Sequence, residues 1–424
     1  PAPEADEHFE RLRHWGFNCL RFLVTWEAIE HAGPGLYDLV YLDYLQKMVA
    51  KAGEYGFHVF IDPHQDVWSR WTGGDGAPAW TLEAAGFDIT KLHKTGAAFL
   101  HQEHGDPFPT MRWVSNYNKL GAATMFSLFF AGNDLAPQTK VDGVPIQEYL
   151  QSHYFNAIKK VAELVKEMPH VMGYDSLNEP HPGWIGREDL TVSGALAPSG
   201  QDPTPFQSML LGAGLAQEVP VVELGVTGVK TLYTAIVNHE QERVWRDGYA
   251  GVWRENQVWD LDGEGEPRLL RPRHFAEVNG RAIDFVDDYY RPFVERFARE
   301  IRSVHPSAIV FTEEPLTCEL PDVQALPNVV NAGHWYDAMT LFMRRYVAQV
   351  AIDSKARRPI FGKGAIDKSF AKQLGEIKQH GREKCGGPSL LGEFGIAYDL
   401  DDKIGFSEDN FASHIAAMDR TWRA

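Results

Sequence analysis

Short apolar segments alternate along this chain with stretches of helical periodicity, and this alternation restricts the fold more than any other feature. The apolar segments predict six strands, at residues 18–24, 57–62, 171–177, 307–313, 328–334 and 389–393. Periodic apolar positions predict helices at residues 4–15, 41–55, 116–130, 146–167, 284–305, 366–384 and 409–423. Strands that alternate with helices favour a parallel sheet covered by helices. The sequence therefore predicts an α/β fold, a (β/α)8 TIM barrel.

The number of predicted strands falls short of a closed barrel. A (β/α)8 barrel needs eight strands, and the sequence shows six. Because the chain begins and ends on predicted helices, we expect the first and eighth strands to be missing from it. On this interpretation, residues 1–424 form one barrel domain that is incomplete at both ends.

Two long connections interrupt the alternation. Residues 63–110 are rich in aromatic residues and glycine, and a loop of this length in a compact domain usually carries function. Its tryptophans argue against disorder. Residues 181–280 are rich in glycine and proline and contain further tryptophans. We expect this second stretch to be an insertion beside the mouth of the barrel, with a small helix at residues 228–239.

The composition limits the partners of this fold. The chain has 41 basic and 58 acidic residues, and its net charge of −17 disfavours binding to nucleic acid or to an anionic membrane surface. A neutral, lipid-like substrate is compatible with this charge. Cys19, Cys318 and Cys385 are far apart and lack Cys-x-x-Cys spacing, which indicates reduced thiols rather than disulfides or a zinc knuckle. The sequence also has no Asn-x-Ser/Thr sequon, so we expect an intracellular location, in the cytoplasm or a vacuole.

Polar residues gather where the predicted strands end. Arg21 lies in the first strand, and the other strand ends carry His64, Asp66, Asn178, Glu179, Glu313, Glu314, His334, Tyr336 and Glu393. Each has a structural alternative: an arginine can form a structural ion pair, a histidine can be a hydrogen-bonded core residue, and Glu313-Glu314 can cap a turn. Because the carboxyl ends of barrel strands share one rim, their joint occurrence favours a sugar-binding site.

Two carboxylates predict the chemistry of this rim. Glu179 follows a strand and precedes a proline, and Glu393 ends the last predicted strand. A retaining glycosidase uses one protonated and one ionised carboxyl group about 5–5.5 Å apart. We expect Arg21 and Tyr336 to hold Glu393 ionised, and Glu179 to stay protonated beside it. Asn178 is placed to bind the 2-hydroxyl group of the sugar.

Two other chemistries compete with this interpretation. The set His64, Asp66, Glu179, His334 and Glu393 contains metal-ligand types, but the sequence has neither His-x-His nor His-Glu-x-x-His. No Gly-x-Gly-x-x-Gly opens a helix after a strand, so a dinucleotide site is unsupported. We therefore expect no catalytic metal and no cofactor, since two carboxyl groups supply both the proton and the nucleophile.

Several motifs together resemble glycoside hydrolase family 5, a family of retaining (β/α)8 enzymes. They are the strand of Arg21, Asp62-Pro-His-Gln-Asp66, Leu177-Asn-Glu-Pro180, His334-Trp-Tyr336 and Gly392-Glu-Phe-Gly395. The run from Asp62 to Trp80 looks like the endoglycoceramidase-related branch of that family. With Leu120 to Gly132, it is most similar to the fungal glucosylceramidase and steryl β-glucosidase subgroup. The resemblance spans nearly the whole chain.

The resemblance implies a role for each matching residue. Glu179 is the implied acid/base and Glu393 the implied nucleophile. The implied supporting residues are Arg21, Asn178, His334 and Tyr336, and the implied substrate-binding residues are His64, Asp66, Trp71 and Asp75. The implied reaction is hydrolysis of a glucolipid, either a steryl β-glucoside or glucosylceramide, by double displacement. The family's eighth-strand tryptophan, which floors the sugar site, and the branch's C-terminal β-sandwich are absent from this sequence.

The residues leave other functions open. The same fold could act on polysaccharides as an endo-β-glucanase or mannanase, or bind carbohydrate without turnover. The aromatic connections could form an apolar groove for the aglycone, with peripheral contact to membrane lipid, or they could pack in the core. The sequence does not separate a sterol from a ceramide aglycone, and it gives no oligomeric state.

Overall fold

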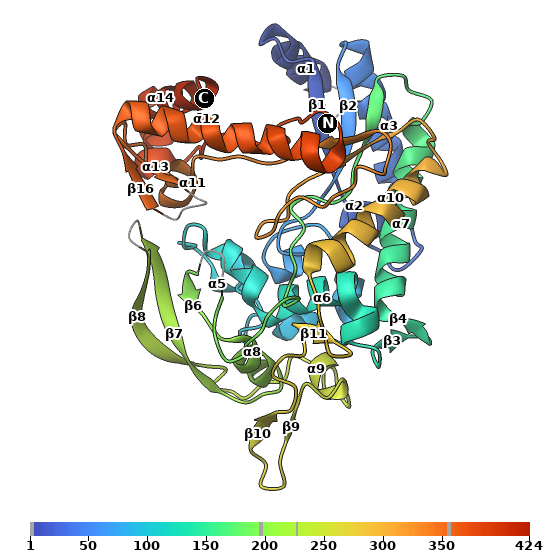
Figure 1. The fold of residues 1–424 in the computed structure, drawn as a ribbon, viewed down its shortest axis with the longest axis vertical. Coiled ribbons are helices and arrows are strands. Elements are labelled where there is room, and N and C mark those ends of the chain that lie inside the picture. Colours follow the sequence, from blue (N-terminus) through green and yellow to red (C-terminus); the bar gives the residue numbers. More distant parts are fainter. Residues whose placement is uncertain (1–3, 195–197, 226–227, 354–357) are drawn as a thin grey trace.

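A parallel sheet lies at the centre of the fold. The computed structural model of the chain describes residues 4–194, 198–225, 228–353 and 358–424. The sheet has five strands in the order β1-β2-β5-β13-β14, and all neighbouring strands are parallel (Figure 1). Their bounds are β1 (Cys19–Thr25), β2 (His58–His64), β5 (Val171–Asp175), β13 (Ile309–Thr312) and β14 (Val329–Asn331). The first five predicted strands are therefore confirmed.

The sixth predicted strand, at residues 389–393, is not a continuous strand. The segment lies beside β14 but pairs through isolated parallel bridges, Asn331 with Ser389 and His334 with Glu393. At Gly392 the two backbones approach closely, because a Cβ atom there would lie 2.3 Å from the carbonyl oxygen of Ala332. Glycine at such a close approach interrupts a regular ladder. The segment still occupies the position next to β14 that the prediction assigned to it.

Helices cover the sheet with their apolar sides. α10 (Arg291–Arg302) buries Phe293, Val294, Phe297, Ala298 and Ile301, a helical spacing that leaves its charged residues on the outer side. The other long outer helices are α1 (Ala5–His14), α3 (Leu39–Glu54), α7 (Ile146–Val165) and α12 (Lys363–His380). In Figure 1, α3, α7 and α10 stand together on one side of the molecule and α12 crosses its top.

One helix lies inside the molecule. α6 (Leu120–Leu135) is buried along nearly its whole length, as its uniformly apolar sequence requires. The predicted helix at 116–130 is divided between the 3-10 helix η4 (Arg112–Asn118) and α6. The predicted helix at 284–305 is divided between the π-helical η5 (Phe285–Tyr290) and α10.

Short elements complete the described parts outside the insertion. The helices are α2 (Trp26–Glu30), η2 (Arg70–Thr72), α4 (Ala79–Ala84), η3 (Ile89–Lys91), α5 (His101–His104), α11 (Ala338–Met343), η6 (Gly381–Cys385), α13 (Leu400–Ser407) and α14 (Ala412–Trp422). The strands form two antiparallel pairs, β3 (Lys140–Val141) with β4 (Val144–Pro145) and β15 (Val350–Asp353) with β16 (Arg358–Phe361).

The predicted helix at residues 228–239 is wrong. Residues Gly228–Val237 form strand β8, which pairs with β7 (Gln217–Gly225) in an antiparallel ribbon. The run from Val229 to Val237 is rich in β-branched and aromatic residues, which favour an extended backbone. The ribbon adds β6 (Gly200–Gln201) at one edge, below the barrel in Figure 1.

The rest of the stretch between β5 and η5 consists of short elements. They are α8 (Pro205–Gly212), α9 (Val252–Glu255), β9 (Trp259–Leu261), β10 (Pro267–Leu269), β11 (Glu277–Val278) and β12 (Arg281–Ala282). Residues 195–197 and 226–227 of the predicted insertion lie outside the described residues.

The aromatic connection after β2 is ordered and packs into the core. Trp68 and Trp80 are buried, and both rings meet Trp26 edge-on. These tryptophans therefore anchor the loop that carries Asp66 and Asp75. Among the helices in the described parts of the chain, none has the length and apolar composition of a bilayer span.

Candidate active site

The parallel strands end at one edge of the sheet, and the predicted polar residues lie there. His64 is the last residue of β2, while Glu179, Glu313 and His334 follow β5, β13 and β14. Strands that run in parallel bring their carboxyl ends to the same rim. Glu393 reaches this rim because its backbone is bridged to His334 and accepts a hydrogen bond from the Trp335 amide (3.0 Å).

The backbone of Glu179 is held in an unusual conformation. Its φ of +39° lies in the left-handed region, which residues with a Cβ atom rarely adopt. Gln65 stabilises this turn, because its Nε2 donates to the carbonyl oxygens of Asn178 (2.8 Å) and Glu179 (3.1 Å). Asn178 Nδ2 donates in return to the Gln65 carbonyl oxygen (2.8 Å). The sequence analysis missed Gln65, although its position at a strand end could have indicated it.

The two predicted catalytic carboxylates face each other. A carboxylate oxygen of Glu179, a carboxylate oxygen of Glu393 and a ring nitrogen of His334 all lie within 4.8 Å of one another. Both carboxyl groups are mostly buried, with 16% and 22% of their side chains exposed. This separation is close to the spacing of about 5–5.5 Å that double displacement requires.

Glu393 is surrounded by groups that favour its ionised form. Arg21 Nη1 contacts Oε1 directly, and the Tyr336 hydroxyl donates to Oε2 (2.8 Å). His334 Nδ1 lies 3.5 Å from Oε2. Burial by itself raises the pKa of Glu393, but His334, Arg21 and the Tyr336 hydrogen bond outweigh it and lower that pKa below its usual value. Glu393 is therefore a carboxylate at neutral pH.

Glu179 has a different set of neighbours. His334 Nδ1 lies 3.0 Å from its Oε1, and among the described residues His334 is the one histidine, lysine or arginine side chain within 4.0 Å of the Glu179 carboxyl group. The other ring nitrogen, Nε2, lies 3.1 Å from Oε2 of Glu313. His334 thus connects Glu179 at the surface of the site with a buried acid below it.

Arg21 is the central cation beneath the site. Its Nη2 donates to Asn178 Oδ1 (2.8 Å) and lies 3.2 Å from Asp62 Oδ1. The same nitrogen lies 3.7 Å from both Asp175 and Glu313. Burial acts to lower the pKa of Arg21, but these acids and Glu393 raise it above its usual value, so the guanidinium keeps its charge. Asp62 and Asp175 belong to the site although the sequence analysis named neither as a site residue.

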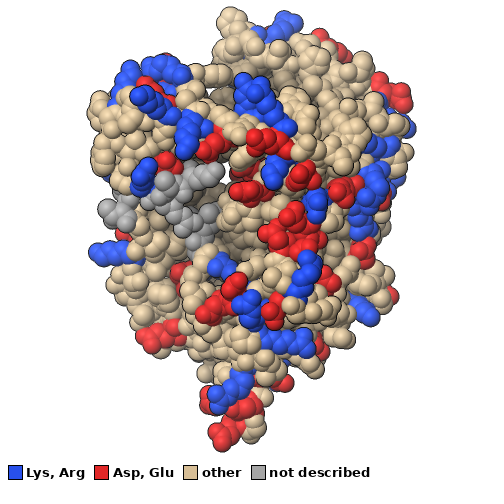
Figure 2. Space-filling view, viewed as in Figure 1, with Lys and Arg blue, Asp and Glu red and all other residues tan. Residues whose placement is uncertain are grey.

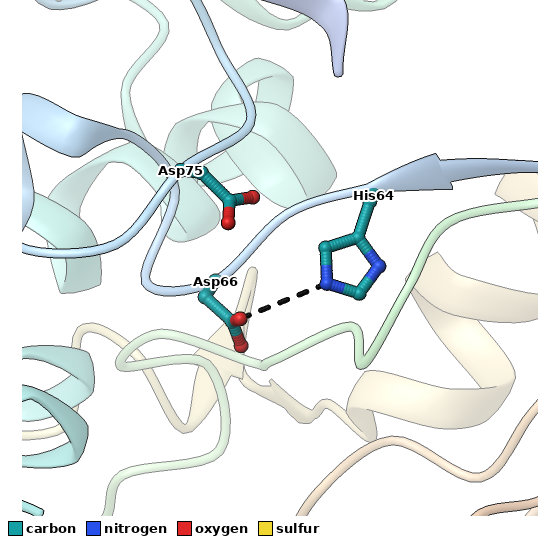
Figure 3. Close-up of side chains that lie close together, drawn as sticks. All are labelled: His64, Asp66 and Asp75. Carbon is teal, nitrogen blue, oxygen red and sulfur yellow. Dashed lines mark ion pairs between the residues drawn. The ribbon is translucent and has the colours of Figure 1, made fainter. Parts of the chain in front are cut away.

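A second cluster lies on the loop after β2. Figure 3 shows His64, Asp66 and Asp75 facing one another, with the ion pair between His64 Nε2 and Asp66 Oδ2 (3.7 Å) drawn dashed. The backbones of Asp66 and Asp75 are joined by two hydrogen bonds of 3.2 and 3.1 Å. These bonds close the loop and place both carboxylates beside the imidazole ring. The other ring nitrogen, Nδ1, lies 2.8 Å from buried Asp62.

The charges of the second cluster follow from its burial. Burial lowers the pKa of His64, but hydrogen bonds to Asp62 and Asp66 outweigh it and raise that pKa to about 10. Burial raises the pKa of Asp66 to about 6, although His64 opposes the change. Burial also raises the pKa of Asp75. At neutral pH the cluster is therefore a charged, partly dehydrated surface that can hydrogen-bond several hydroxyl groups.

Trp71 lies on η2, between Asp66 and Asp75 in the chain. Its ring is half-buried, and the Arg70 guanidinium lies 5.1 Å from the ring centre. Its indole Nε1 is buried without a hydrogen-bond partner within the described structure. No hydrogen bond joins Trp71 to the two clusters in the described parts of the chain, so its predicted role in substrate binding stays a prediction.

Both clusters have the geometry of a metal site. Each brings one histidine nitrogen and two carboxylate oxygens within 4.8 Å of one another. Three such ligands are a common metal set. This geometry fits a bound metal ion as well as it fits acid–base catalysis. A chelation experiment distinguishes the two.

The comparisons with known proteins agree with this geometry. A family model described as Cellulase (glycosyl hydrolase family 5) matches residues 2–192. A crystal structure of Cryptococcus neoformans sterylglucosidase 1 is 34% identical and superposes with a TM-score of 0.92, covering 99% of this chain and 65% of that one. Residues 2–192 therefore carry a glycosyl hydrolase family 5 domain. The family match and this superposition confirm the predicted (β/α)8 barrel class.

Curated relatives of this chain are named for glucolipids. Glucosylceramidase of Rhizopus delemar is 38% identical, and the match covers 99% of this chain and 64% of the relative. Ergosteryl-beta-glucosidase of Saccharomyces cerevisiae is 31% identical over 98% of this chain and 62% of the relative. The chain thus spans less than two thirds of the length of these relatives. The resemblance to the glucosylceramidase and steryl β-glucosidase subgroup is confirmed.

Proposed function

We propose that this chain is the catalytic part of a retaining β-glucosidase that hydrolyses glucolipids, either steryl β-glucoside or glucosylceramide. The observation that carries the proposal is the short distance between the two carboxyl groups. An oxygen of Glu179 and an oxygen of Glu393 lie within 4.8 Å of each other, and a ring nitrogen of His334 lies within 4.8 Å of both. The names of the relatives support a lipid aglycone.

In the first step, Glu393 is the nucleophile. Its carboxylate oxygen forms a bond to the anomeric carbon while the bond from that carbon to the aglycone oxygen breaks. Glu179 gives its proton to the departing oxygen, so the aglycone leaves as a neutral alcohol. Arg21 and Tyr336 hold the attacking carboxylate in place and keep it ionised.

In the second step, water releases the glucose. Glu179, now a carboxylate, takes a proton from water, and the water oxygen attacks the anomeric carbon from the face the aglycone left. The ester bond to Glu393 breaks and the anomeric configuration is retained. Asn178 Nδ2, oriented by its bond to Gln65, is placed to bind the sugar 2-hydroxyl during both steps.

The second cluster binds the glucose ring. Ionised Asp66 and Asp75 accept hydrogen bonds from sugar hydroxyls, and His64 donates to them. Because Asp62 fixes the orientation of His64, the cluster is preorganised before the sugar arrives. We assign the flat face of Trp71 to an apolar contact with the sugar or the adjoining aglycone.

The lipid part of the substrate needs an apolar surface beside this site. A cavity of about 410 Å³ lies against α11, the helix that follows Tyr336. Met111, Leu224, Phe342 and Met343 are its apolar lining residues, and the other eight lining residues are polar or charged. Figure 2 shows that this face of the molecule is hollowed near its middle and carries mixed charges around the hollow. We propose that the aglycone extends toward this cavity, and that the protein meets its substrate at a lipid surface.

We also propose that the protein is intracellular, in the cytoplasm or a vacuole. Cys19, Cys318 and Cys385 are free thiols, which supports a reducing, intracellular compartment. Imaging the full-length protein as a fluorescent fusion, together with markers of the cytoplasm, the vacuole and the cell surface, tests this. A signal at the surface or in the medium contradicts it.

The function is tested by comparing substrates directly. The protein is incubated with steryl β-glucoside, glucosylceramide, cellulose and mannan, and released sugar is measured. We expect release from a glucolipid and none from the polysaccharides, with the β-anomer as the first product by proton NMR. A 2-fluoro-glucoside should leave a glycosyl adduct on Glu393 by mass spectrometry. Turnover of polysaccharide alone would replace this proposal with an endo-glucanase or mannanase, and no turnover with sugar binding would indicate a binding protein.

A further inference from the structure

An acid that the mechanism above does not use lies directly beneath His334. Glu313 follows the last residue of β13, and only 1% of its side chain is exposed. Its Oε2 lies 3.1 Å from His334 Nε2, and its Oε1 lies 3.7 Å from Arg21 Nη2. Its backbone oxygen accepts a hydrogen bond from the Tyr290 hydroxyl (3.2 Å). These contacts fix the carboxyl group below the imidazole ring.

The charges around Glu313 disfavour a carboxylate at this position. Arg21 is shared with two other fully buried acids, Asp62 and Asp175, and with Glu393. Oε1 of Glu313 and Nε2 of His334 are both buried, and within the described residues neither has a hydrogen-bond partner. Burial, then Asp175, raise the pKa of Glu313 well above its usual value, and Arg21 opposes this only in part. The titratable and charged groups that face it are Arg21, Asp62, Asp175, Glu179 and His334.

We propose that Glu313 is a positioning residue, whose carboxylic acid donates its O–H to His334 Nε2 and so keeps the imidazole proton on Nδ1. This inference deepens the proposed function and rests on it. An imidazole that accepts at Nε2 must donate at Nδ1 to remain neutral. The Nδ1–H group then points at Glu179 Oε1, 3.0 Å away, with Glu393 Oε2 at 3.5 Å.

This tautomer has a consequence for catalysis. The hydrogen bond from His334 occupies Oε1 of Glu179, which leaves Oε2 to carry the proton that the aglycone oxygen receives. With the proton on Nε2 instead, a nitrogen lone pair would face both carboxyl groups and repel the ionised one. Glu313 therefore orients the acid/base through His334 and touches no substrate itself.

Two substitutions test whether Glu313 acts by donating a hydrogen bond to His334 or only by filling space. Glu313→Gln keeps a neutral donor, because its side-chain amide can donate to His334 Nε2. Glu313→Met keeps the volume but has no donor. We expect kcat for an aryl β-glucoside to stay within about threefold of wild type in Glu313→Gln and to fall by roughly 10- to 100-fold in Glu313→Met, with KM little changed. The pH profile of Glu313→Gln should match wild type.

Glu300→Gln is the matched control. Glu300, on α10, pairs with Lys159 (2.7 Å) and is 34% exposed. Its substitution should leave activity unchanged. Thermal unfolding of each variant reports whether it folds.

The tautomer of His334 is read directly by nitrogen NMR of the histidine-labelled chain, assigned with His334→Gln. We expect a neutral ring protonated at Nδ1 in wild type and in Glu313→Gln, a result that does not depend on turnover. A proton on Nε2, a doubly protonated ring, or a shifted pH profile in Glu313→Gln would each overturn the proposal. If the wild-type chain cleaves no β-glucoside, the proposed function fails, and the NMR result still decides the role of Glu313.

Discussion

The rim of the sheet holds two clusters that each consist of one imidazole and two carboxyl groups. One contains Glu179, His334 and Glu393, and the other His64, Asp66 and Asp75. In both, one histidine nitrogen and two carboxylate oxygens lie within 4.8 Å of one another. Composition and spacing therefore do not distinguish them.

Their surroundings do distinguish them. Arg21 and Tyr336 reach Glu393, and together with His334 they lower its pKa below the usual value despite burial. Within the described ranges no arginine and tyrosine reach Asp66 in this way, and burial raises its pKa to about 6 even beside charged His64. Carboxyl groups in two similar clusters thus acquire different pKa values from the residues around them. We infer that the first cluster performs the chemistry and that the second binds the sugar.

Substitution of the nucleophile in the first cluster should reduce kcat more than any other change. Glu393→Gln removes the attacking oxygen, and we expect kcat for an aryl β-glucoside to fall by at least ~10⁴-fold. The variant should stay folded by circular dichroism, because glutamine fills the same space. Glu408→Gln, on an exposed glutamate, is the control. Substantial remaining activity would remove Glu393 from the nucleophile role.

The second-largest loss of activity should follow substitution of Glu179, the other carboxyl group of the first cluster. Glu179→Gln removes the proton donor, and we expect a loss of about 10²- to 10⁴-fold on an alkyl or steryl glucoside. A glucoside with an acidic phenol as leaving group needs less protonation, so the first step on it should suffer much less. Equal losses on both substrates would contradict the assignment of Glu179 as the acid.

A smaller effect tests the second cluster as a binding surface. Asp66→Asn removes a charged hydrogen-bond acceptor, and we expect KM to rise by roughly 10- to 100-fold with a smaller change in kcat. Because the pKa of Asp66 is raised to about 6, its carboxylate predominates above that pH and is lost below it. The wild-type KM should therefore increase as the pH falls through about 6, and Asp66→Asn should lack this dependence. A loss confined to kcat would assign the cluster to catalysis.

A modest effect concerns the groups that lower the pKa of Glu393. Tyr336→Phe removes the hydrogen bond to Oε2, so the pKa of Glu393 should rise. The acidic limb of the kcat/KM profile should then move to higher pH by about one unit, since a hydrogen bond to a charged group contributes ~1.5 kcal/mol. Rates at the wild-type optimum should fall only severalfold. An unmoved acidic limb would show that Arg21 and His334 alone set this pKa.

The smallest expected effect addresses the metal geometry that the clusters share. Prolonged dialysis against EDTA should leave kcat and KM unchanged, because two carboxyl groups supply the proton and the nucleophile. Atomic emission of the purified protein checks for bound metal. Activity that is lost and then restored by one divalent ion would show that one cluster is a metal site.

Much of the sheet could be predicted from local pattern, and the errors have local causes. Five strands were found because buried parallel strands are short apolar runs bounded by turns. The segment at 389–393 lost its ladder at Gly392, where close contact with Ala332 depends on the partner strand. The helix expected at 228–239 is β8, because the segment pairs with β7 and is rich in β-branched residues.

The candidate active site was likewise predicted where local sequence was sufficient, and not where contacts between distant residues were needed. Glu179, Glu393 and His334 were chosen because they stand at strand ends, and Arg21 because it lies in the first strand; the structure brings all four together. Gln65 was missed, although it stands beside His64 at a strand end, and Glu313 was named only as one of several strand-end residues. Their roles lie in contacts with Asn178 and His334, which are more than 20 positions away in the chain, and sequence spacing does not give these contacts.

Local sequence was sufficient to establish the alternating elements and the kinds of side chain at the strand ends, because hydrophobic periodicity and turn-forming residues act over a few positions. The pKa of each carboxyl group, and the acid that each histidine nitrogen faces, could be read only from the folded chain. These properties depend on burial and on charges a few ångströms away in space, and residues far apart in the chain supply them.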